Sequence, residues 1–221
     1  MEALHSLLGL GLRRLDAEGR LTGEPAGQEL LEGVTALFVV DLEMSGPNPQ
    51  VHEILDIGGV RAALGPGLPE EEAWSARVRP RRIGNAVPAA LRVVGYSPKA
   101  WKTALDLEAA MERFAAVGRD AVVAGWGMGQ DLAFLAEAFR ALGSPWPFAL
   151  AALDVQVIAR ALLRGNGEVD RFNLGHVADR LGIGRMGEHG ALADAYATYD
   201  VLVKLTERGL RRPGKGGGEE P

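Results

Sequence analysis

Two carboxylates follow directly after an apolar run near residue 40. Residues 36–46 read Ala-Leu-Phe-Val-Val-Asp-Leu-Glu-Met-Ser-Gly, and Pro47 comes next. The apolar run, with its β-branched and aromatic members, predicts a buried strand that ends in a turn. Because alternate residues of a strand share a face, Asp41 and Glu43 should point the same way. Two close carboxylates repel each other, which favours a divalent cation between them; the alternative is that they only flank a loop.

Two further acids stand where predicted helices begin. Asp131 follows the short apolar run 121–124 at the start of a helical pattern, and Asp194 comes early in the last helical pattern, after His189. Strand ends and helix starts are where open α/β sheets bind ligands. Four carboxylates from separate elements suit two Mg²⁺ or Mn²⁺ ions, which can hold the attacking and leaving oxygens of a phosphoryl displacement. A neutral His189 beside them could accept the proton of the attacking water.

The rest of the chain predicts a sheet that carries these acids. Three strands joined by short turns form an antiparallel meander, and helices and short strands then alternate, which predicts an α/β fold with a mixed sheet. Ser97-Pro98 has the pattern of a helix start, because proline is favoured at the first helical position. The predicted strands are 36–46, 53–64, 73–80, 121–124 and 148–153, and the predicted helices are 106–117, 130–142, 154–163, 173–181 and one after His189.

Length and composition limit the possible classes. The 221 residues suffice for one α/β domain, and the 47% hydrophobic and 24% charged residues are ordinary for a globular protein. We expect an N-terminal appendage and connector at 1–33, the main domain at 34–208, and a disordered tail at 209–221. The leucine stripe within 1–16 suits a packing appendage or a partner contact.

Charge and cysteine content exclude several functions. The chain has no cysteine, which rules out disulfides and thiol catalysis, and its net charge of -5 argues against a broad basic surface for nucleic acid. No apolar run is long enough to span a bilayer, and the N-terminus lacks the basic start of a signal peptide. We therefore expect a cytoplasmic protein.

Three runs of residues together resemble the motifs of the DEDDh 3′-to-5′ exonucleases. They are Val40–Pro49, Gly129–Leu135 and His189–Thr198. This family includes the proofreading subunit of bacterial DNA polymerase III, ribonuclease T and oligoribonuclease. The resemblance covers roughly 36–206, and the order and spacing of the three motifs make it specific, where any single motif would be weak.

The resemblance implies a ribonuclease H-like mixed sheet of five strands, the first three antiparallel, flanked by helices. It implies that Asp41 bridges two divalent cations, Mg²⁺ or Mn²⁺. Glu43 and Asp194 would complete the first ion, and Asp131 would help to hold the second, with His189 as general base. The implied reaction is hydrolysis of the terminal phosphodiester at a 3′ end, releasing nucleoside 5′-monophosphates. Single-stranded DNA and short RNA both remain candidate substrates.

Three residues in or near the motifs are candidates for contact with the substrate. Leu42 and Met44 resemble residues that contact the terminal nucleotide in similar enzymes. Many relatives have asparagine where this chain has Gly127, which removes a side-chain contact to the substrate or replaces it by stacking of Trp126 on a base. Packing of Trp126 in the loop is the alternative.

Four other residues are considered for a role in the site. Tyr196 and Asp200 have the spacing of the sister DEDDy exonucleases, which would replace His189 as the signature residue. Asp56 lies inside an apolar strand and is expected to bond to a neighbouring backbone group. Asp154, after the last short strand, is expected to cap a helix rather than bind a metal.

Two functions compete with a 3′-to-5′ exonuclease. One is a catalytically silent module of the same fold that binds a nucleic-acid end or a polymerase. The other is a different metal-dependent phosphodiesterase that acts on small nucleotides. The expected partners are the 3′ end of single-stranded DNA or RNA, together with a DNA polymerase or a second copy of the chain bound through 1–33.

Overall fold

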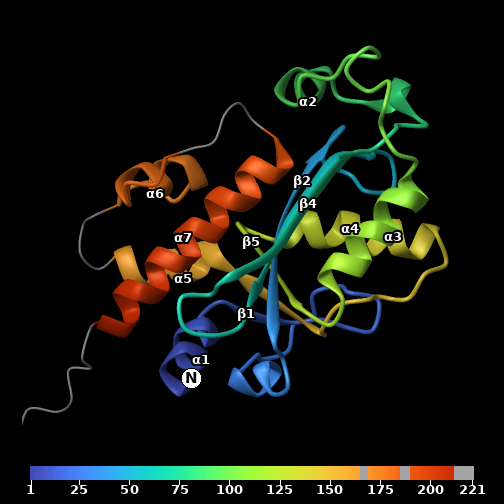
Figure 1. Ribbon diagram of the computed structural model, residues 1–221. Helices are drawn as coiled ribbons and strands as arrows, with labels where there is room; N and C mark the ends of the chain where they lie inside the picture. Colours follow the sequence, from blue (N-terminus) through green and yellow to red (C-terminus); the bar gives the residue numbers. More distant parts are fainter. Residues whose placement is uncertain (165–168, 185–189, 212–221) are drawn as a thin grey trace, which may run out of the picture.

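A mixed six-stranded sheet forms the centre of the computed structural model, which describes residues 1–164, 169–184 and 190–211 (Figure 1). Its order is β1-β6-β5-β2-β3-β4. The strands are β1 (Leu12–Arg14), β2 (Ala36–Met44), β3 (Ile54–Ala63), β4 (Glu70–Arg77), β5 (Val122–Gly125) and β6 (Ala151–Asp154). The antiparallel meander β2-β3-β4 and the parallel neighbours β5 and β6 confirm the predicted mixed α/β sheet.

The sheet has one strand more than the five that were expected. Strand β1 comes from the segment before residue 34, and it pairs antiparallel with β6 through Leu12 and Leu153. The chain enters β1 at Gly11, where a Cβ would lie 2.6 Å from the carbonyl oxygen of Asp154. This close approach requires glycine. Gly11, which was expected only to weaken a helix, therefore allows β1 to pair with β6. The division of the chain at 33 and 208 stays a prediction.

The described helices follow the predicted order with one exception. Residues 98–103 form turns, so the helix expected at Ser97-Pro98 is wrong, and a short helix begins earlier, at Pro88. The side chain of Trp101 overrides the local pattern, because its Nε1 donates to the Leu55 carbonyl oxygen at 3.0 Å. The helices are α1 (Glu2–Gly9), α2 (Pro88–Val93), α3 (Leu107–Gly118), α4 (Gly129–Ala141), α5 (Val155–Leu163), α6 (Leu174–Arg180) and α7 (Ala191–Arg211), with 3₁₀ turns at Gln28–Leu31 and Ile83–Asn85.

The described helices cover both faces of the sheet. Helices α1, α5, α6 and α7 lie on one side, and α3 and α4 lie on the other (Figure 1). Strand β2 alternates between the two cores: Leu37 and Val39 join the first cluster, whereas Phe38 and Val40 join the second. Asp41 continues the face of Val39, so the period of the strand directs its carboxylate toward the α7 side. None of the helices in the described ranges is long and apolar enough to cross a membrane.

Aromatic rings fill the core between β2 and α3. The ring of Phe38 is fully buried, and its centroid lies 4.8 Å from that of Phe114 and 6.0 Å from that of Phe148. Gly59 and Gly118 leave the space for it, since a Cβ at either position would lie 2.4 Å or less from a Phe38 ring carbon. The ring therefore fixes the strand that carries Asp41 and Glu43.

Replacing this ring should destabilise the whole domain. Phe38→Ala is expected to lower the free energy of unfolding by about 3–5 kcal/mol, because the change removes buried contacts and leaves a cavity. Urea unfolding followed by circular dichroism measures the change. Val51→Ala, at a side chain that is 39% exposed, is the control and should change stability little. Equal stability of the two variants would contradict the role given to the ring.

Candidate metal centre

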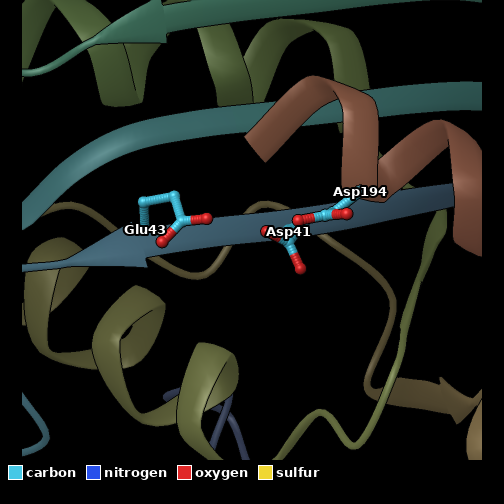
Figure 2. Close-up of side chains that lie close together, drawn as sticks. All are labelled: Asp41, Glu43 and Asp194. Carbon is cyan, nitrogen blue, oxygen red and sulfur yellow. The ribbon is translucent and has the colours of Figure 1, made fainter. Parts of the chain in front are cut away.

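Three carboxylates converge near the end of β2 (Figure 2). Asp41, Glu43 and Asp194 each offer one oxygen, and these oxygens all lie within 4.8 Å of one another. The first two stand on the same face of β2, and the third extends from the first turn of α7. All three residues are half-buried. A group of carboxylate oxygens at this spacing suits a hard divalent cation.

A close contact between β3 and α7 brings Asp194 to the strand. Gly58 on β3 is the partner of Asp41 in the β2-β3 ladder. A Cβ on Gly58 would lie only 2.3 Å from the backbone nitrogen of Leu192. The helix can therefore begin directly over the strand pair only because residue 58 lacks a side chain. This role of Gly58 is not evident from the sequence, since a glycine in a strand indicates a close approach without revealing what approaches.

The fourth acid, Asp131, lies in the first turn of α4 and is only 9% exposed. Strand β5 is parallel to β2, with Ala124 beside Val39, so α4 begins next to the end of β2. Asp131 is not among the three residues whose oxygens converge within 4.8 Å. Its charge nevertheless acts on Asp41, and the charge of Glu43 acts on Asp131. The four acids thus share one region of the structure.

Burial and mutual repulsion oppose ionisation of these acids. Burial raises the pKa of Asp41 well above its usual value, and the nearby carboxylates raise it further. Burial, followed by the charge of Glu43, raises the pKa of Asp131 to about 7. Buried carboxylates that repel one another fit a divalent cation, whose charge would favour the ionised form of each.

The proposed general base, His189, lies outside the described residues, so its role stays a prediction. The structure does not support the competing pair of Tyr196 and Asp200. The hydroxyl of Tyr196 donates to Glu70 at the start of β4, with a distance of 2.8 Å. Glu70 pairs with Ala62 of β3, which pairs with Leu37 of β2. Leu37 precedes Asp41 by four residues, which is roughly 13 Å along a strand.

The residues expected to contact substrate fall into two places. Leu42 and Met44 line an open depression beside Glu43. Trp126 does not line it, but packs partly buried against the hydrophobic cluster on the α7 side. The substrate roles of all three stay predictions. The depression is also lined by Val87, Ala90 and Val93, from and beside α2, and no sequence pattern pointed to these residues.

Asp154 caps helix α5, as predicted. Its Oδ1 accepts hydrogen bonds from the backbone nitrogens of Gln156 at 3.0 Å and Val157 at 3.4 Å. The same oxygen accepts a bond of 3.2 Å from the backbone nitrogen of Gly127, which has a left-handed φ of 68°. Asp154 therefore also holds the loop between β5 and α4, and so contributes indirectly to the placement of Asp131.

Comparisons with known proteins agree on one family. A family model described as the RNase_T exonuclease family matches residues 38–202. A PolC-type DNA polymerase III of Thermotoga maritima is 25% identical over 178 residues, which is 79% of this chain and 12% of the polymerase. The epsilon subunit of DNA polymerase III from Aquifex aeolicus is 25% identical over 179 residues, covering 80% of this chain and 83% of that subunit.

A solved structure shows the same fold. Exonuclease I of E. coli in complex with a dT13 oligonucleotide has a TM-score of 0.65 and 20% sequence identity, covering 80% of this chain and 42% of that one. The chain thus spans 12% of the length of the polymerase and less than half of that exonuclease.

Removing one buried charge should stabilise the metal-free protein. Burial raises the pKa of Asp131 to about 7 in the folded protein, whereas an exposed aspartate, as in the unfolded chain, has a pKa of 3.8. Unfolding between these values releases the proton, so stability falls as pH rises from about 4 to about 7. Asp131→Asn removes this loss. We expect it to be more stable than wild type in EDTA at pH 8, by at most about 4 kcal/mol, and similar to wild type at pH 4.

Thermal unfolding at the two pH values measures this effect. Addition of Mn²⁺ in excess should raise the Tm of wild type at pH 8 and raise that of Asp131→Asn much less. A variant that is less stable than wild type at pH 8 in EDTA would show that Asp131 is not a source of repulsion.

Proposed function

The chain belongs to the RNase_T exonuclease family, and on that premise we propose that it is a metal-dependent 3′-to-5′ exonuclease. The proposed reaction is hydrolysis of the terminal phosphodiester of single-stranded DNA or short RNA, which releases nucleoside 5′-monophosphates. The observation that carries the proposal is the convergence of Asp41, Glu43 and Asp194 within 4.8 Å.

The four acids would hold two divalent cations, Mg²⁺ or Mn²⁺. Asp41 would be shared between the two ions, with Glu43 and Asp194 on the first and Asp131 on the second. Bound there, the cations would stabilise the charge on the attacking and leaving oxygens. Because burial and repulsion raise the pKa of Asp41 and Asp131, cation binding near neutral pH should release protons.

The chain's own groups would manage the proton and the terminal nucleotide. We propose that His189 accepts the proton of the attacking water. Leu42 and Met44 would contact the terminal base and sugar, since they line the depression directly beside Glu43. The apolar side chains of Val87 and Val93, which are 37% and 59% exposed, would form the opposite wall. Such a depression favours contact with the planar face of a base over sequence readout.

The relatives' names suggest the substrate and the partners. Exonuclease I was solved with a thymidine oligonucleotide, and the Aquifex relative is a DNA polymerase subunit. We therefore propose single-stranded DNA as one substrate, a DNA polymerase or a second copy of the chain as partner through residues 1–33, and a cytoplasmic location. The alternative of a catalytically silent binding module is not favoured, because the acids expected for catalysis come together.

Removal of the shared ligand should abolish activity. Asp41→Ala is expected to reduce cleavage to background, because the change removes the carboxylate proposed to contact both cations. The assay is a time course with 5′-labelled single-stranded DNA, a matching RNA and a dinucleotide, each with Mn²⁺, Mg²⁺ or EDTA. Wild type should shorten the polymer stepwise from its 3′ end only when the cation is present.

The control for this assay is Glu72→Ala, which removes an exposed acid on β4. It should leave the rate unchanged and also reveals contaminating nucleases. Near-normal cleavage by Asp41→Ala would refute the two-cation assignment. Cleavage of the dinucleotide alone would instead indicate a phosphodiesterase for small nucleotides.

The general base can be tested separately from the acids. His189→Ala should lower the rate by roughly 10²- to 10⁴-fold, the usual contribution of a general base, with little change in oligonucleotide binding. Tyr196→Phe should have little effect on the rate, because the Tyr196 hydroxyl donates to Glu70, which is not one of the four proposed metal ligands. Single-turnover rates of the two variants decide between the assignments. A larger loss in Tyr196→Phe would mean that the DEDDy register is correct.

A further inference from the structure

The two acids on β2 stand opposite two particular residues of β3. In the antiparallel ladder Asp41 pairs with Gly58, and Glu43 pairs with Asp56. Paired residues project on the same face of a sheet. The four residues therefore lie next to one another beneath the first turn of α7. The two from β2 supply carboxylates to the proposed metal centre. The two from β3, Asp56 and Gly58, are not assigned as metal ligands and need another explanation.

The β3 side of this square contacts the start of α7. The Oδ2 of Asp56 accepts a hydrogen bond of 3.3 Å from the backbone nitrogen of Ala191, the first residue of the helix. At Gly58 a Cβ would lie 2.3 Å from the nitrogen and 2.5 Å from the Cα of Leu192. One residue thus bonds the end of the helix, and the other allows it to approach. Asp56 was expected to bond a neighbouring backbone group, and the backbone of the adjacent Ile57 does act on its carboxylate. The bond from Ala191, 135 positions away, comes in addition.

Strand β4 places a positive charge, that of Arg77, next to Asp56. Arg77 is the ladder partner of Asp56, and its positive charge acts on that carboxylate. The guanidinium carbon of Arg77 lies 4.7 Å from the ring centroid of Trp101, and its Nη1 donates to the Ala100 carbonyl oxygen at 2.7 Å. The arginine is therefore held by the Trp101 ring and the Ala100 carbonyl group. Its charge partly offsets that of Asp56, a carboxylate that still adds to the repulsion on Asp41.

We propose that Asp56 is a positioning residue, which fixes the first turn of α7 so that Asp194 reaches the cations bound by Asp41 and Glu43. The inference rests on the proposed function, because it assumes that these acids bind cations. Ala191 precedes Asp194 by less than one turn of helix. A bond that anchors its backbone nitrogen therefore sets the height and rotation of the turn that carries the Asp194 carboxylate. In this role Asp56 acts through α7 and needs no contact with the substrate.

The test is direct titration of the full chain with Mn²⁺, with free Mn²⁺ followed by electron paramagnetic resonance. Asp56→Ala should weaken Mn²⁺ binding by roughly 10- to 100-fold, the usual effect of losing a residue that orients a metal ligand. Asp56→Asn keeps an oxygen acceptor and should stay closer to wild type. At saturating Mn²⁺, Asp56→Ala should recover most of its cleavage rate with an unchanged KM for the oligonucleotide.

A packing control separates positioning from general loss of stability. Ile57→Val removes one buried methyl group from the same strand on its opposite face, and it should keep the wild-type affinity for Mn²⁺. If Asp56→Ala does not fold, Asp56→Ser replaces it, because a serine hydroxyl is too short to reach the nitrogen of Ala191. Wild-type affinity in the Asp56 variant, or an equal loss in Ile57→Val, would overturn the proposal.

Asp41→Asn in the same titration tests the underlying metal centre. It should bind Mn²⁺ much more weakly than wild type. If it binds normally, the metal centre itself is wrong and the proposed function fails together with this inference. If it loses binding while the Asp56 variants keep it, only the positioning role fails.

Discussion

The repulsion among four partly or fully buried carboxylates is the constraint on which the rest of the structure depends. Asp41, Glu43, Asp131 and Asp194 come from β2, α4 and α7, and the chain has no cysteine that could cross-link these elements. Burial and neighbouring charge raise the pKa of Asp41 and Asp131, so ionisation pushes against the packing. The two hydrophobic clusters on the faces of the sheet must therefore hold the elements in place. Tight cation binding requires a rigid scaffold that holds the carboxylates in place although they repel one another.

Strand pairing gives this scaffold its precision. A shift of the β2-β3 register by one residue would turn Asp41 and Glu43 to the other face and would also move Gly58 away from α7. The same register thus specifies both the direction of the two acids and the site where the helix docks. Because Phe38 anchors β2 from the opposite face, an aromatic core remote from the chemistry contributes to the geometry of the acids.

The sequence was sufficient where the signal is local and periodic. The strand period placed Asp41 and Glu43 on one face, and the apolar patterns gave the order of strands and helices. It failed where long-range contacts decide. Both Val87-Pro88 and Ser97-Pro98 satisfy the pattern of a helix start, but Trp101 is bonded to β3, and only the first pair begins a helix. A glycine such as Gly58 likewise gives no sign of the helix that packs on it.

Strand β1, which the expected five-stranded sheet lacked, connects the N-terminal segment to the candidate metal centre. The family match begins at residue 38 and thus includes β3 to β6 and most of β2, whereas β1 precedes it. Strand β1 covers the edge of β6, and the backbone nitrogen of Asp154 donates to the Gly11 carbonyl oxygen at 2.9 Å. Asp154 in turn holds Gly127, in the loop that leads to Asp131. The segment before the matched region therefore supports one of the four acids through β6, because it fixes the strand end from which that loop is held.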